Sequence, residues 1–144
     1  MARGIAELER LINSRLAEKQ RAVSQINEGD VQGGADTLGD LAQAQAAEAE
    51  GLAAESAQAR ARAAETFREQ GAVLRAVSVA EATRAYENAA RLQPEHFWTW
   101  IELSRLYLYG LGQTGKARDA AERAFSAAEN DWDRGLAMTL EAVS

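Results

Sequence analysis

The sequence has no cysteine, and only one proline and one histidine among its 144 residues. The absence of cysteine excludes a disulfide framework, a thiol nucleophile and a zinc–thiolate site. The single histidine, His96, excludes a metal site built on two histidines. Because proline normally marks loops and strand edges in all-β and α/β domains, the lone Pro94 disfavours both classes.

Basic residues are in the minority, with a formal net charge of −6 and a pI of about 4.9. A surface that binds nucleic acid needs an excess of Lys and Arg on one face, so we expect no nucleic-acid partner. The sequence also lacks a run of roughly 18 apolar residues, and acidic residues interrupt the N-terminal region where a signal peptide would be apolar. We therefore expect a soluble cytoplasmic protein with no membrane partner.

The residues that are abundant favour helices. Apolar residues make up 47% of the chain and aromatic residues 6%, and much of the apolar share is alanine, the strongest helix former. Glu, Gln, Arg and Leu follow alanine closely in helix propensity. The composition therefore predicts an all-α fold with a single thin core in which the helices lie close together.

The N-terminal region has the spacing of an amphipathic helix over residues 4–27. Its apolar positions are Ile5, Leu8, Leu11, Ile12, Leu16, Val23 and Ile26. Gly29 is suited to a left-handed C-terminal cap, and Asp30 to the N-cap of a second helix. Gly33 and Gly34 each cost about 1 kcal/mol relative to alanine in a helix, so we place the start of the second helix near Asp36.

A stripe of small residues follows at steps of three and four, and such an eleven-residue period favours a slight right-handed supercoil. The stripe comprises Ala35, Leu38, Ala42, Ala46, Ala49, Ala53 and Ala57. We predict one long helix that continues to about residue 76, with a break near Gly51 to Ser56 and a solvated, fraying rod as the alternatives. Residues 1–63 then form an N-terminal helical hairpin or long Ala-rich helix. Its segment 35–63 carries one functional hypothesis, homodimerisation of a structural helical module.

A repeat of 35 residues occupies the second half of the chain. Ala82, Tyr86 and Ala89 recur as Ala117, Ala121 and Ala124, and Pro94 lies between the two copies. Steps of four and three place each trio on one helix face, where small side chains admit a neighbouring helix. The period predicts two successive helix pairs that nest against one another.

These residues resemble the tetratricopeptide repeat family. The segment 80–94 looks like the second helix and closing proline of the motif, and the next stretch looks like a whole repeat with one extra residue near Gly110 to Gly115. The matching positions of that repeat are Trp100, Leu103, Ser104, Tyr107, Gly112, Ala117 and Ala124. Upstream, Phe67 and Gly71 fit the first helix of the earlier repeat less closely.

The resemblance implies an antiparallel helix-pair superhelix with two pairs over residues 64–130. Residues 131–144 would be a capping helix or the start of a further repeat, in a fragment of a longer repeat protein of bacterial type. In this family the first helices of successive repeats line a concave groove. Trp98 lies about 200° around the helix from Trp100, so it belongs on the groove side unless it packs against the N-terminal helix instead.

The resemblance therefore implies a non-catalytic scaffold that binds a peptide or helix of a partner protein. The groove residues that it implies are Arg68, Ala72, Arg75, Trp98, Ile101, Arg105, Leu108 and Tyr109. The paired basic and Asn positions of relatives that bind acidic chaperone tails are not evident, so that specificity is not predicted.

Two near matches to catalytic motifs carry little weight. Gly110 to Gly115 followed by Lys116 has the spacing of a phosphate-binding loop, but Ala117 occupies the position of the required hydroxyl and a helix precedes the loop. His96 lies in a predicted loop with no nucleophile near it. We predict no enzymatic activity, no cofactor and no metal site.

Overall fold

The computed structural model describes the backbone of residues 2–51 and 57–144, and the side chains of residue 10 and of residues 13–47 and 57–144. Within these ranges every regular element is helical, as the composition predicts. The elements are α1 (Ala2–Asn27), α2 (Val31–Gly51), α3 (Ala57–Leu74), α4 (Val79–Leu92), α5 (Phe97–Arg105), the π-helical segment η2 (Leu106–Gly110), α6 (Thr114–Ala127) and α7 (Asp131–Val143).

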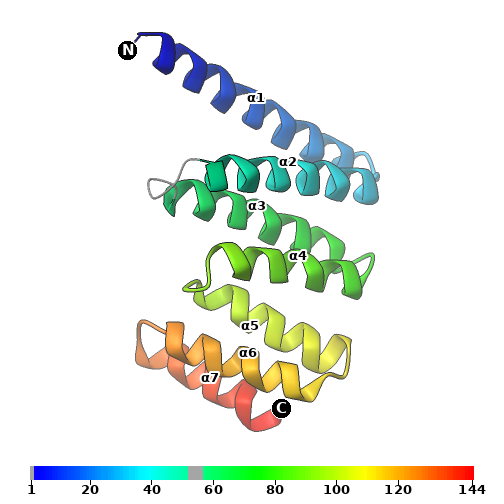
Figure 1. Cartoon of the computed structure of the whole chain (residues 1–144). Coiled ribbons are helices and arrows are strands. Elements are labelled where there is room, and N and C mark those ends of the chain that lie inside the picture. Colours follow the sequence, from blue (N-terminus) through cyan, green and yellow to red (C-terminus); the bar gives the residue numbers. More distant parts are fainter. Residues whose placement is uncertain (1, 52–56) are drawn as a thin grey trace.

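The helices form a single antiparallel stack, with α1 at one end and α7 at the other (Figure 1). Each helix packs chiefly against its neighbours in the sequence. The turns after α1, α3 and η2 lie along one edge of the stack, and those after α4 and α6 lie along the opposite edge (Figure 1). Short connections of this kind favour antiparallel neighbours.

Local caps fix most helix starts. Gly29 has a φ of +93°, and the Asp30 carboxylate accepts a hydrogen bond of 2.9 Å from the backbone N–H of Gly33. Such a cap is worth about 1 kcal/mol, which offsets the poor helix propensity of the first turn. The second helix therefore starts at Val31, and the prediction of a start near Asp36 was wrong.

The prediction of one long helix from residue 35 to residue 76 was also wrong. Helix α2 ends at Gly51 and α3 begins at Ala57, as the alternative with a break expects, although residues 52–56 themselves lie outside the described part. The two helices pack side by side, which buries Ala42 and Ala63 completely. Folding back removes this apolar surface from water, whereas a single rod would leave it exposed.

The recurring small residues of the second half are buried, as the 35-residue period predicts. Their exposed fractions are 0% for Ala82, Ala89, Ala117, Ala121 and Ala124, and 4% for Tyr86. Helices α4 and α6 therefore use equivalent positions to approach their neighbours.

Glycine allows the closest of these approaches. A Cβ atom added to Gly34 would lie 2.9 Å from the backbone oxygen of Ala22 in α1, and one added to Gly71 would lie 2.6 Å from the ring of Tyr86 in α4. The Tyr86 ring is itself buried, so it has little room to yield. Gly115 in α6 has nothing within 4 Å of the added atom.

We predict that Gly71→Ala lowers the free energy of unfolding by about 1–3 kcal/mol, because overpacking forces α3 away from α4. Gly115→Ala is the matched control, and it should be neutral or stabilising by up to about 1 kcal/mol since alanine is the better helix former. Urea denaturation followed by circular dichroism measures both. Equal stabilities for the two variants would contradict the close approach.

Candidate functional site

Helix α5 begins at a histidine cap. The His96 Nδ1 atom accepts a hydrogen bond of 3.3 Å from the backbone N–H of Thr99 and lies 2.9 Å from the Thr99 Oγ1. One turn later the Trp100 Nε1 donates a hydrogen bond of 2.7 Å to the Pro94 carbonyl. These bonds fix the rotation of α5, and Trp98 lies on the side opposite Trp100 with half of its surface exposed.

Glu102 joins α5 to α3. Its carboxylate accepts a hydrogen bond of 2.7 Å from the guanidinium of Arg75, in the turn directly after α3, and the Arg105 guanidinium lies 3.7 Å away. Because Trp98 and Arg105 flank Glu102 at helical spacing, all three side chains share one face of α5. The same face of the stack includes Arg75 and, one turn before it, the exposed Ala72.

We call this surface the α3–α5 face. Its residues are Arg68, Ala72, Arg75, Trp98, Glu102, Arg105 and Tyr109. Three arginines and one glutamate give it a positive charge, although the whole chain carries −6.

Arg68 stabilises the connection between α4 and α5. Its Nη1 donates a hydrogen bond of 3.0 Å to the Gln93 Oε1 and lies 3.5 Å from the Thr99 Oγ1. Burial lowers the pKa of the guanidinium, and the nearby Glu65 partly opposes this shift. Arginine stays charged throughout the physiological range, so Arg68 supplies a fixed positive charge at the base of the face.

Two of the eight predicted groove residues, Ile101 and Leu108, lie in or against the core. Ile101 is only 2% exposed and packs with Phe97 and Ala137 in the core. Leu108 is half-buried against the core cluster that α4, α5 and α6 form. Neither side chain offers much surface to a partner.

Trp98 does not pack against the N-terminal helix, which the sequence left open. Its ring contacts Phe97 edge-on at a centroid distance of 5.0 Å, and the ring remains 50% exposed. Helix α1 lies at the far end of the stack (Figure 1).

Glu102 is the residue of this face that sequence reasoning missed. The sequence carried one signal for it. Glu102 lies four residues after Trp98 and three before Arg105, so helical spacing places it between them on the same helix face. Its contact with Arg75, 27 residues earlier, depends on where the stack places the turn after α3 relative to α5, and it has no signature in the sequence.

A π-helical turn places Tyr109. The backbone N–H of Leu111 donates a hydrogen bond of 3.0 Å to the Leu106 carbonyl, five residues earlier, and Gly112 then takes a φ of +65°. Such a turn holds one residue more than an α-helical turn. Tyr109 projects from it with 72% of its surface exposed.

The loop that resembles a phosphate-binding loop follows this helical turn and not a strand. The Lys116 ammonium lies 5.8 Å from the centre of the Tyr107 ring, in a cation–π contact. Burial, with Glu87 nearby, raises the pKa of Tyr107 to about 12. Lys116 is therefore engaged with the protein's own aromatic ring.

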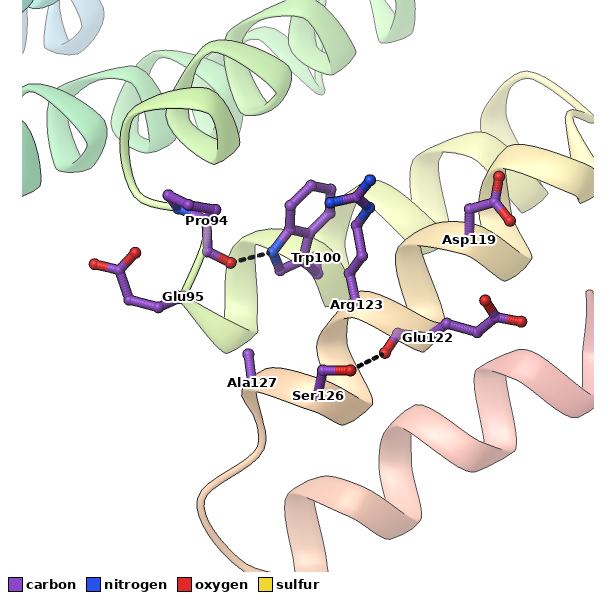
Figure 2. Close-up of a pocket in the computed structure, with 8 residues that line it drawn as sticks. All are labelled: Pro94, Glu95, Trp100, Asp119, Glu122, Arg123, Ser126 and Ala127. Atoms are coloured by element: carbon purple, nitrogen blue, oxygen red, sulfur yellow. Dashed lines mark hydrogen bonds between the residues drawn. The ribbon is translucent and has the colours of Figure 1, made fainter.

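A hollow lies on the side of α5 that carries Trp100. It has a volume of about 580 Å³, and Figure 2 shows the residues that line it. The Arg123 guanidinium lies 5.1 Å from the centre of the Trp100 ring, and Glu95, Asp119 and Glu122 surround the pair. The Arg123 guanidinium thus covers the aromatic ring of this hollow, and the other charged groups of its lining are the three acidic side chains.

The described residues contain no group of three His, Asp or Glu side chains placed to hold a metal ion. They also contain no helix with the length and hydropathy needed to cross a bilayer.

The chain was also compared with known proteins. No family model matches it, and no curated protein matches its sequence.

The histidine cap predicts a dependence of stability on pH. Burial is the main cause that lowers the pKa of His96 below its usual value near 6.5, and the positive charge of Arg68 adds to it. The unfolded chain thus binds a proton at a higher pH than the folded chain, so acidification from pH 7 through the lowered pKa should reduce stability.

His96→Asn retains a good N-cap without a titrating ring. We expect wild type to lose more stability than this variant between pH 7.5 and pH 5.5, measured by urea denaturation at each pH. Parallel losses in the two proteins would show that His96 does not contribute.

Proposed function

We propose that this chain is a non-catalytic interaction module, built from tetratricopeptide-like helix pairs, that binds a segment of a partner protein on the α3–α5 face. The 35-residue period and the burial of both of its copies support the repeat architecture. In this arrangement α3 and α4 form one pair, α5 and α6 form the next, and α7 begins a third. The cytoplasmic location expected from the sequence stays a prediction.

The extra residue in the second repeat has a structural counterpart. The repeat over residues 100–124 contains one residue too many, and the π-helical turn at η2 accommodates one extra residue within a helix. The extra residue therefore leaves the α5 and α6 contacts in place. Ser104 at the end of α5 still donates a hydrogen bond of 2.9 Å to the Ala117 carbonyl in α6.

The observation that carries the proposed function is the exposure of two aromatic rings beside ordered charges. Trp98 and Tyr109 are 50% and 72% exposed, and the ion pair of Arg75 with Glu102 lies on the same face. Exposed aromatic and arginine side chains are the residue types that dominate binding energy at protein interfaces. A surface pair of this kind adds at most about 1 kcal/mol to stability, so folding alone gives little reason for the arrangement.

The charge of the face favours one class of partner. Arg75 and Arg105 both direct their guanidinium groups at the single Glu102 carboxylate, which leaves one positive charge in excess, while the charge of Arg68 is partly offset by the nearby Glu65. A partner with apolar side chains and one or two carboxylates would match both the rings and this excess.

No observation favours the alternative hypothesis of homodimerisation through residues 35–63. Such an interface would need the alanine stripe to be free, but Ala35, Ala42 and Ala46 are buried within one chain. Ala49 and Ala53 lie outside the described side chains, and Ala57 is exposed.

Removal of both aromatic rings tests the proposal. We expect the double variant Trp98→Ala, Tyr109→Ala to fold normally and to weaken partner binding by at least about 30-fold, which corresponds to roughly 2 kcal/mol. The measurement is affinity capture of partners from a lysate, followed by titration of the captured partner. Phe125→Ala is the matched control, because it removes an exposed ring from α6, outside the face. Unchanged capture by the double variant would contradict the proposal.

The charge preference has a separate test on peptide arrays. Two peptide series with the same apolar pattern carry either Glu or Lys at the remaining positions. The chain should bind the Glu series with the higher affinity, and this affinity should fall as the salt concentration rises. Arg75→Ala should weaken binding of the Glu series by about 5- to 30-fold, whereas Arg84→Ala, which removes an exposed arginine from α4, should not. Preference for the Lys series would contradict the assigned charge complementarity.

A further inference from the structure

Helix α7 carries the most exposed large apolar side chain in the described part of the chain. Trp132 is 81% exposed, and Met138 and Val143 on the same helix are 57% and 53% exposed. Single apolar side chains on a surface are normal, but a cluster of them marks an interaction site.

Trp132 and Val143 lie on one face of α7, whereas Met138 lies about 120° away around the helix. At 100° per residue, Trp132, Leu136, Thr139 and Val143 fall within an arc of about 60°. Gly135 and Ala142 lie beside this arc, and no charged residue falls within it. We call the six residues the outer face of α7: Trp132, Gly135, Leu136, Thr139, Ala142 and Val143.

The outer face is held firmly by contacts on the other side of the helix. Ala137 and Leu140 are buried against Ile101 and Ala121 of the preceding helices. Asn130 caps the N-terminus of α7 through a hydrogen bond of 2.8 Å from the Asp133 N–H, and Arg118 of α6 donates a hydrogen bond of 2.8 Å to the Ser144 carbonyl. The face is thus a fixed surface.

The corresponding face of α5 is covered by another helix. The 35-residue period matches Trp132, Gly135 and Thr139 to Phe97, Trp100 and Ser104 of α5, and α6 packs over these three residues. Phe97 is 7% exposed and Ser104 0% exposed. On α7 no described residue covers the matching positions, so this face has the features of a helix contact without the contacting helix.

We propose that the outer face of α7 binds the same face of a second copy of this chain, as an antiparallel pair about a twofold axis. An antiparallel register about the middle of α7 pairs Trp132 with Val143 of the partner copy, and Leu136 with its Thr139. Each large side chain thereby meets a smaller one, while Gly135 and Ala142 let the backbones approach. Such an interface is closed, because the same patch serves both copies.

Charge and area are consistent with this occupant. The charged side chains of α7, including the paired Asp131 and Arg134, lie off the outer face, so the register brings no like charges together. Two copies of the face bury on the order of 1,000 Å² in total, the lower end of the range for specific interfaces. We therefore expect a reversible dimer in the micromolar range.

The primary test is the mass of the full chain in solution. Sedimentation equilibrium at about 100 µM chain should give twice the chain mass of 15.6 kDa. Trp132→Glu and Gly135→Glu should each weaken the dimer by at least about 100-fold, because each buries a charge in the interface. Trp98→Glu, on the α3–α5 face, is the matched control and should leave the dimer intact.

The Gly135→Glu variant should keep its fold, because a Cβ atom added to Gly135 has nothing within 4 Å. A monomeric wild type at 100 µM would overturn the proposal, as would a dimer that both α7 variants leave unchanged. Because the chain has no cysteine, a nitroxide on Met138→Cys, which is 57% exposed and lies off the outer face, reports the register without blocking the interface. The antiparallel pair predicts a distance below roughly 25 Å between the labels of two copies, and a longer distance would assign the dimer to another surface.

Discussion

The structure depends on how closely successive antiparallel helices approach one another. Aromatic residues make up only 6% of the chain, so most of the core consists of alanine and leucine. Small side chains bury little area each, and they stabilise the fold only when the helix backbones lie near enough to contact them. Gly34 and Gly71 mark the places where even a methyl group would be too large.

This thin packing also explains where the larger side chains lie. A helix that buries a narrow stripe of small residues has wide faces left for solvent. On α5 the stripe cannot hold four large apolar side chains in the segment 97–101, so Phe97 and Ile101 enter the core, Trp100 lies in the hollow beside α6, and Trp98 remains on the α3–α5 face. The exposed aromatic ring is thus a direct result of the sequence periodicity.

Much of the helical architecture could be predicted from local sequence. The cap at Asp30, the left-handed Gly29 and the buried trio of α4 follow from contacts within one or two turns or from a regular spacing. The division into α2 and α3 could not be settled locally, because the isolated glycines of the segment permit either a continuous helix or a break. The contact of Ala42 and Ala46 with Ala63 and Ala64 decided it.

For the candidate site, the sequence by itself determined the helical class and the helix face on which Trp98 and Arg105 lie, because helical periodicity requires only the order of residues. The π-helical turn that places Tyr109 interrupts this periodicity. The tertiary structure alone decided that Arg75 meets Glu102, that Ile101 is buried, and that the outer face of α7 is left uncovered. These outcomes depend on which helix lies beside which, and at what rotation. That choice results from the summed packing of the whole stack, which no single segment of the sequence encodes.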